Sequence, residues 1–138
     1  MQRTLDWLRQ SKKDLAHARK SLEMEDFEWS CFSAQQSAEK AVKALYENLR
    51  GHTYGHSVSA LLSRLPTRAR PGLDLIAEAK ILDRHYIPTR YPNSHPQGAP
   101  MDYYTRRDAE EAVRIADRIQ RYCQSRIRRP KAKSRTRS

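Results

Sequence analysis

The sequence predicts an all-α fold, an up-and-down bundle of four to five helices with a basic C-terminal tail. Three observations predict it. The chain has 138 residues, which suits a single domain. Long stretches are rich in Ala, Leu, Glu, Lys, Arg and Gln, which favour helix, whereas Val, Ile and Thr are thinly spread. Apolar residues recur at alternating spacings of three and four, as expected of helices with one buried face.

The first helix is predicted over residues 4–22. Its seam consists of Leu5, Leu8, Leu15 and Leu22, with Lys12 and Arg19 in the intervening positions. The spacing is helical, and Asp6 near the start favours the positive end of the helix dipole. We therefore expect this seam, Leu5 included, to pack against a second helix.

The second helix has the clearest pattern. Its seam runs through Cys31, Gln35, Ala38, Val42, Leu45 and Leu49. Such a seam has to face another helix, and Trp29, Phe32 and Tyr46 are expected to widen it into a buried face. Gly51 is expected to end the helix, because glycine tolerates left-handed backbone geometry. Gln35 is expected to form a hydrogen bond across the bundle or at a dimer seam.

Three more helices follow in the prediction. Ser57 is placed to cap a short helix over 58–65, and a fourth helix runs over 73–85. Thr105 caps the last helix, whose buried face consists of Ala109, Ala112, Val113, Ala116, Ile119 and Cys123. Acidic residues crowd its first turns and complement the helix dipole.

The sequence predicts a cytoplasmic protein that does not act at a membrane. No run approaches the roughly 20 apolar residues that cross a bilayer. The N-terminus is interrupted by charge throughout, so it is no signal peptide. Cys31 and Cys123 lack the paired spacing of a zinc site, and we interpret them as reduced, buried thiols.

Much of the net charge of +11 lies at the C-terminal end. Residues 126–138 hold seven Arg or Lys and no acid, so the remainder carries about +4. We divide the chain into a helical bundle over 1–126 and a basic tail over 127–138 that does not fold alone. The tail is suited to RNA, DNA or an acidic partner, or it serves only as a solubilising extension.

Prolines at every fourth position, Pro88, Pro92, Pro96 and Pro100, predict an ordered, functional loop before the last helix. The loop carries Arg90 and His95. Arginine binds a phosphate in bidentate fashion, and histidine can take a proton from a ribose 2′-hydroxyl or give one to a leaving oxygen. These are the minimum for metal-independent RNA cleavage. The alternative is structural: Arg90 pairs with Asp83 or Asp102, and His95 is a solvated loop residue.

The other histidines are weaker candidates. His52 and His56 lie on a glycine-containing turn with no carboxylate or thiol nearby in sequence, so we expect no metal site. His85 ends a predicted helix, where the dipole favours a cation. We expect no cofactor, because no glycine-rich phosphate loop is present.

Several of these segments resemble the HEPN domain family, named for higher eukaryotes and prokaryotes and for nucleotide binding. The resembling segments are YIPTRYPN at 86–93, the Pro-x-Gly at 96–98, YT at 104–105 and DAEEA at 108–112. Upstream, FSAQQSAEKAVKAL at 32–45 is similar to the family's second helix, and HS at 56–57 followed by LL at 61–62 to its third. The resemblance covers nearly the whole bundle, from Leu5 to Arg126, in the family's order.

This resemblance implies a helical bundle that forms a homodimer and pairs with a small nucleotidyltransferase in toxin–antitoxin fashion. Catalytic members carry an Arg, four to six residues and a His, and cleave RNA without metal in a cleft between subunits. If the family's catalytic residues are assigned to this sequence, the resemblance implies that Arg90 and His95 are the catalytic pair. The ligand-binding set is Tyr86, Arg90, Tyr91, Asn93 and Tyr104.

Two hypotheses follow. The first is a module that binds nucleotide or RNA through the Arg90 loop. Two departures from the family pattern favour it: Tyr91 stands where catalytic relatives often have a polar residue, and Gln97 stands where those paired with the nucleotidyltransferase often have a tyrosine. The sequence is also similar to the sacsin C-terminal branch, which is associated with nucleotide binding. The second is a metal-independent ribonuclease of toxin–antitoxin type. They differ over His95.

Overall fold

The computed structural model describes residues 3–86, 93 and 95–127, and over these residues the chain is helical with no strand. The α helices are α1 (Thr4–Glu23), α2 (Phe27–Asn48), α3 (Val58–Ser63), α4 (Leu73–Asp83) and α5 (Arg106–Arg126), with short 3-10 turns η1 (Thr67–Ala69) and η3 (Pro100–Asp102). The all-α prediction is confirmed.

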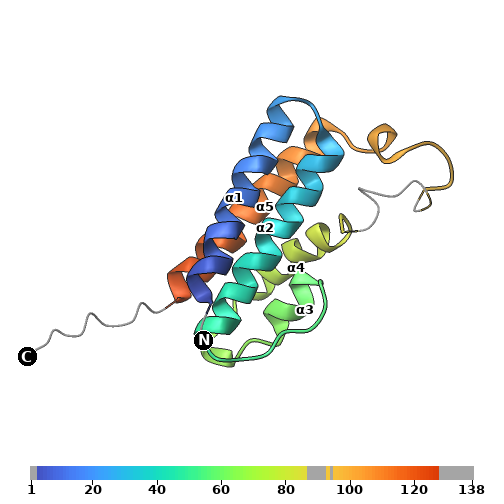
Figure 1. The fold of residues 1–138 in the computed structure, drawn as a ribbon. Helices are drawn as coiled ribbons and strands as arrows, with labels where there is room; N and C mark the ends of the chain where they lie inside the picture. The colour runs from blue at the N-terminus through green and yellow to red at the C-terminus, as the bar shows by residue number, and fades with distance from the viewer. Residues whose placement is uncertain (1–2, 87–92, 94, 128–138) are drawn as a thin grey trace, which may run out of the picture.

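The three long helices α1, α2 and α5 pack side by side, and α3 and α4 cover one side of this trio (Figure 1). α1 and α2 are antiparallel neighbours. The short helices carry the chain back along the bundle, so α5 begins at the same end as α2 and runs parallel to it (Figure 1). The segment 95–105, directly before α5, protrudes from the bundle at that end (Figure 1).

The contact face of α1 differs from the predicted seam. Leu8 and Leu15 are buried, but Leu5 is 66% exposed and the remaining contact positions belong to small residues such as Ser11 and Ala18. The Ser11 hydroxyl donates to the Ser37 carbonyl oxygen at 2.7 Å, and the Ser37 hydroxyl donates to the Ser11 carbonyl oxygen at 2.8 Å. Because these bonds satisfy both buried hydroxyls, serine can occupy the contact face. The seam predicted from the leucines is therefore one position off, since Ser11 and Ala18 lie at the contact in place of Lys12 and Arg19.

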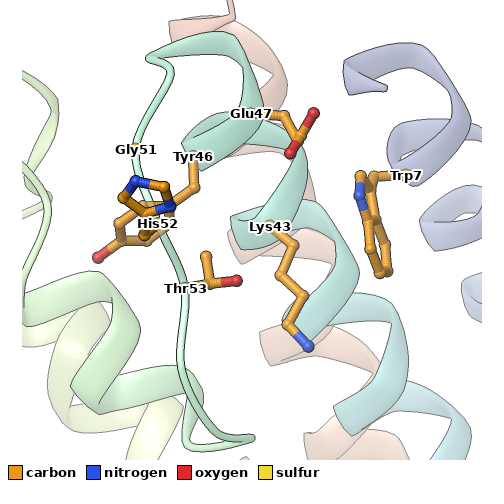
Figure 2. A pocket seen from close by; sticks show the side chains of 7 residues that line it. All are labelled: Trp7, Lys43, Tyr46, Glu47, Gly51, His52 and Thr53. Atoms are coloured by element: carbon orange, nitrogen blue, oxygen red, sulfur yellow. The ribbon is translucent and has the colours of Figure 1, made fainter. Parts of the chain in front are cut away.

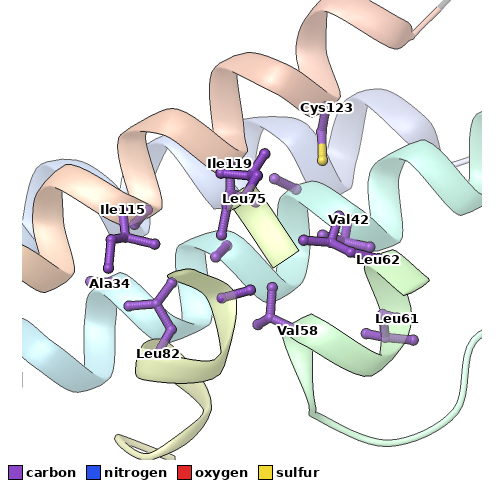
Figure 3. Packing of buried hydrophobic residues seen from close by; sticks show 14 of the residues in the cluster. Ala34, Val42, Val58, Leu61, Leu62, Leu75, Leu82, Ile115, Ile119 and Cys123 are labelled. Atoms are coloured by element: carbon purple, nitrogen blue, oxygen red, sulfur yellow. The ribbon is translucent and has the colours of Figure 1, made fainter. Parts of the chain in front are cut away.

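The core lies where α2 meets α5, α3 and α4 (Figure 3). The fully buried apolar side chains are small or branched: Val42, Leu45, Val58, Leu61, Leu62, Leu65, Leu82, Ile115 and Ile119, with alanines between them. Cys31 and Cys123 are buried free thiols, as predicted. Burial raises the pKa of each to about 12, so both stay protonated and unreactive in the folded protein.

Two expectations about α2 are wrong. Trp29 does not widen the buried face, because its residue is 47% exposed. Nor is Gly51 the left-handed residue after the helix: α2 ends at Asn48, and Arg50 takes the positive φ of 59°. Gly51 instead leaves room for the Tyr46 ring, since a Cβ there would lie 3.1 Å from Cδ1 of Tyr46.

Ser57 caps α3 as predicted, accepting from the Ala60 N–H at 3.2 Å. The carboxylate of Asp83, at the end of α4, adds a second cap: it accepts from the Val58 N–H at 2.6 Å and from the Ser57 hydroxyl at 3.0 Å. α3 and α4 are thereby joined end to end at the point where the chain enters the proline-rich loop.

Within the described ranges, no helix has the length and apolar character that a bilayer crossing requires. The predicted basic tail, 127–138, lies outside the described residues apart from Ile127.

Candidate functional site

Arg90 and Tyr91, the centre of the predicted site, lie outside the described residues, as do Pro88 and Pro92. Of the other predicted site residues, Asn93 is exposed, and Tyr86, His95 and Tyr104 are partly buried. Tyr86 lies before the loop, His95 lies on it and Tyr104 follows it, and each contacts other described rings.

Rings from α4, the loop and the approach to α5 form a continuous series. His95 stacks on Tyr103, with ring centroids 4.1 Å apart and planes at 9°. It meets Tyr104 edge to face at 6.2 Å, and Tyr104 in turn meets His85 at 5.6 Å. The two predicted site residues His95 and Tyr104 are therefore in one cluster, together with Tyr103 and His85, which the prediction omitted.

The end of the loop is held by backbone-directed bonds. The Asp102 carboxylate accepts from the Ala99 N–H at 2.9 Å, and the Tyr103 hydroxyl donates to the Gln97 carbonyl oxygen. Gly98 has φ of +78°, and a Cβ there would lie 2.9 Å from the same Asp102 carboxylate. The positive φ therefore favours glycine at this turn. The result is an ordered frame around the His95–Tyr103 stack.

The electrostatics at His85 differ from the prediction. The sequence placed a cation there, but burial lowers the pKa of the His85 imidazole, opposed by Asp108 and reinforced by Arg84. The loss of water around the ring is the largest cause of this shift, because it disfavours the charged form. Burial likewise raises the pKa of Tyr104 to about 12, with Cys31 and Asp108 adding to the effect. Both rings are neutral near pH 7, and the Tyr104 phenol can donate a hydrogen bond.

The two carboxylates proposed as partners for Arg90 have other roles. Asp83 caps α3 through the Ser57 and Val58 bonds described above and also accepts from the Ser59 hydroxyl. Asp102 binds the Ala99 N–H. Both groups are therefore engaged in holding the backbone on either side of the loop.

A second cluster, which the sequence analysis missed, lies where the loop begins. His56 stacks on Tyr86, with ring centroids 4.5 Å apart and planes at 15°. Its Nδ1 is 3.0 Å from Oε2 of Glu39, a carboxylate in the middle of α2 whose side chain is only 6% exposed. This carboxylate is distant from His56 in sequence, and the fold brings the two together because α2 packs against the turn after it.

Glu39 has three partners in this cluster. Besides His56, Lys43 donates to its Oε2 at 2.7 Å and Gln35 donates to its Oε1 at 3.0 Å. Gln35 also donates to the His56 carbonyl oxygen at 3.2 Å. Both of these Gln35 bonds stay within α2 and the turn after it rather than crossing the bundle, and they tie the His56 turn to α2. The sequence signal was the polar pair Gln35 and Glu39, four residues apart on a face that is otherwise apolar.

The other histidine of the turn lies elsewhere. His52 borders a pocket of about 220 Å³ lined by Trp7, Lys43, Tyr46, Glu47, Gly51, His52 and Thr53. Figure 2 shows the Trp7 ring on one side, the Tyr46 and His52 rings on the other, and Lys43 between them. The Lys43 ammonium is 5.6 Å from the Trp7 ring centroid. None of the residues that the sequence proposed for the site lines this pocket.

Both clusters offer aromatic rings and a histidine to a ligand. The rings of His95, Tyr103 and Tyr86 offer surfaces on which bases can stack, and His56 and His95 can each exchange a proton or a hydrogen bond with a ligand. Among the described residues, no three His, Cys, Asp or Glu side chains gather into a metal-binding group.

Comparison with known proteins identifies the family of the chain. The family model described as the HEPN domain matches residues 4–126. Putative toxin MJ1304 of Methanocaldococcus jannaschii is 28% identical over 123 residues, covering 82% of this chain and 80% of its own.

Solved structures agree with the family match. TT1696 of Thermus thermophilus has a TM-score of 0.88 and 44% identity, over 91% of this chain and 99% of its own. ST0689, an archaeal HEPN homologue, has a TM-score of 0.79 and 40% identity, over 93% and 100%. An HEPN domain protein of Thermotoga maritima has a TM-score of 0.71 and 35% identity, over 87% and 95%. The matched residues span α1 to the end of α5 without a break, and the chain belongs to the HEPN domain family.

Proposed function

We propose that the protein binds RNA or a nucleotide at the Arg90 loop, with Arg90 holding a phosphate and Tyr86, Tyr91, Asn93 and Tyr104 contributing to the ligand site. The observation that carries this proposal is that ring clusters lie at both ends of the loop, His56 with Tyr86 before it and His95 with Tyr103 and Tyr104 toward its end. Stacking on aromatic rings and a bidentate arginine are the usual means of binding unpaired nucleotides. Family membership supports the same reading.

The proposed active form is a homodimer, with a small nucleotidyltransferase as a further partner. The half-exposed Trp29 supports an interface on α2, because its ring meets Phe32 at 6.2 Å and Phe32 meets Tyr86 at 6.3 Å. This apolar strip connects α2 to the start of the loop. A subunit packed there would place its residues beside the ligand site.

A second candidate function is metal-independent cleavage of RNA by Arg90 and His95. The relative MJ1304 carries the name putative toxin, which favours it. In this reading His95 takes the proton of a ribose 2′-hydroxyl as the hydroxyl oxygen attacks the adjacent phosphorus. Arg90 stabilises the charge that develops on the phosphate, the bond between phosphorus and the 5′-oxygen breaks, and water supplies the proton that this oxygen takes as it leaves.

One experiment tests both candidates. A 5′-labelled single-stranded RNA is mixed with the protein in excess EDTA, and binding is followed by anisotropy and cleavage by gel electrophoresis. Arg90→Ala should weaken binding at least tenfold, about the strength of one charge-assisted phosphate contact. Arg68→Ala, which removes an exposed arginine of η1, is the matched control and should bind as the parent does.

The outcomes separate the candidates. Cleavage that is lost in His95→Ala and kept in His17→Ala, which changes an exposed histidine of α1, would establish the ribonuclease. Binding without cleavage would establish the binding module. Equal binding by the parent and Arg90→Ala would overturn both.

A further inference from the structure

The His56 ring has one orientation imposed on it. Its Nδ1 faces the Glu39 carboxylate at 3.0 Å and one of its faces covers Tyr86. A carboxylate only accepts hydrogen bonds, and both Glu39 oxygens already accept: Oε2 from the Lys43 ammonium at 2.7 Å and Oε1 from Gln35 at 3.0 Å. The proton of the neutral imidazole is therefore on Nδ1, and Nε2 carries a lone pair that can accept a hydrogen bond.

The accepting nitrogen faces outward. The Glu39 side chain is 6% exposed, whereas that of His56 is 53% exposed. Because Nδ1 and one ring face are covered, the exposed part consists of the other face and the edge that carries Nε2. A buried carboxylate thus holds an exposed acceptor at a set position on the surface.

This acceptor lies next to the proposed ligand site. Tyr86, on which His56 stacks, precedes Arg90 by four residues, and four residues span at most about 14 Å. A phosphate held by Arg90 is therefore no more than a few nucleotides from His56. The groups on a nucleic acid that can donate to Nε2 are base N–H groups and the ribose 2′-hydroxyl, and the hydroxyl occurs at every nucleotide of RNA and at none of DNA.

We propose that His56 accepts a hydrogen bond from a ribose 2′-hydroxyl and makes the site selective for RNA over DNA. Glu39 is a positioning residue, since it acts by holding the tautomer of His56. This inference rests on the proposed function and deepens it, because it names RNA as the ligand and assigns the discrimination to one nitrogen atom.

The test compares fluorescein-labelled oligouridine with oligodeoxyuridine of the same length, in EDTA. These probes differ only in the 2′-hydroxyl, so the ratio of their dissociation constants measures the discrimination. If the parent protein cuts the RNA, all titrations are made in the His95→Ala background, where the probe stays intact. Far-UV circular dichroism and thermal melts confirm that each variant is folded.

His56→Phe is the central variant, because phenylalanine keeps a flat ring against Tyr86 and removes Nε2. The parent should prefer RNA about three- to tenfold, the strength of one neutral hydrogen bond, and His56→Phe should abolish the preference by weakening RNA binding alone. Glu39→Gln should reduce the preference as well, since an amide can donate to Nδ1 and allow the other tautomer. His52→Ala, in the same turn but in the Trp7 pocket, is the control and should keep the preference.

Each other outcome has a definite meaning. If the parent binds RNA through Arg90 but His56→Phe keeps the RNA preference, the inference is wrong and the proposed function stands. If His56→Phe weakens RNA and DNA equally, His56 contacts the backbone or supports the loop, and the assignment to the 2′-hydroxyl is overturned. If the parent binds neither probe, the proposed function fails and the inference fails with it.

Discussion

At the scale of single residues, environment overrides the ordinary behaviour of several side chains. His85 is the clearest case. A histidine at the end of a helix is expected to gain from the dipole as a cation. In this fold its ring packs edge to face against Tyr104. Burial lowers the pKa of His85, although Asp108 opposes the shift. The folded protein therefore binds the proton of His85 less tightly than the unfolded chain does.

This lowered pKa predicts a loss of stability in mild acid. Between the ordinary histidine pKa of about 6.5 and the lower folded value, the unfolded state binds more protons, so stability present above this window is lost as pH falls through it. His85 contributes a slope of at most about 1.4 kcal/mol per pH unit. Urea unfolding from pH 8 to pH 5 should show this slope in the parent and a shallower one in His85→Gln. His17→Gln, exposed on α1, should follow the parent; an identical pH dependence for His85→Gln would contradict the assignment.

At the scale of elements, the short-range signals at helix ends decide where the site residues are held. Thr105 and Asp108 form a reciprocal capping box at the start of α5: the Asp108 N–H donates to the threonine hydroxyl at 3.2 Å, and the Thr105 N–H donates to the aspartate at 2.9 Å. This cap ends the loop directly after Tyr104, so it sets the position of the ring series relative to the bundle.

Thr105→Ala is expected to lower the free energy of unfolding by about 1 kcal/mol, because it leaves an N–H at the helix terminus without its acceptor. Thr105→Ser keeps the hydroxyl and should restore most of the loss. Denaturant unfolding monitored by circular dichroism measures both. A cost for Thr105→Ser as large as that of Thr105→Ala would mean that packing of the threonine methyl, rather than the cap, is responsible.

At the scale of the whole molecule, much of the positive charge lies in the tail, outside the folded bundle. The last described residue is Ile127, packed against the core one position past the end of α5, and residues 128–138 add six basic side chains. If the tail contributes to RNA binding, it does so through phosphates and counterion release, independently of the ring series.

Removal of residues 128–138 is expected to leave the unfolding midpoint unchanged and to weaken RNA binding at low salt. Each lost phosphate contact on a single strand lowers the slope of log affinity against log salt by about 0.7. Anisotropy titrations at several salt concentrations compare the truncated protein with the full chain. An unchanged slope would assign the tail to solubility alone.

Much of the fold could be predicted from local pattern. Cys31, Val42 and Leu45 mark the face of α2 because the helical period is local, and Ser57 and Thr105 mark helix starts because a cap needs only the next three residues. The errors arose where a contact between distant segments decides burial. Leu5 is exposed because hydrogen-bonded serines occupy the α1–α2 contact, and Trp29 is exposed because none of the described elements covers that side of α2.

The features of the candidate site likewise fall into those that local sequence predicts and those that depend on tertiary packing. The sequence by itself determined a helical bundle, its capped helix ends, a proline-rich loop and the residues Arg90 and His95 on it, because each of these follows from residue types at short spacings. Only the tertiary structure joined Glu39 to His56, placed His56 on Tyr86 and stacked His95 on Tyr103. The physical reason is that a hydrogen bond or a ring stack depends on distances of about 3–5 Å between segments far apart in the chain, and those distances are set by how the helices pack.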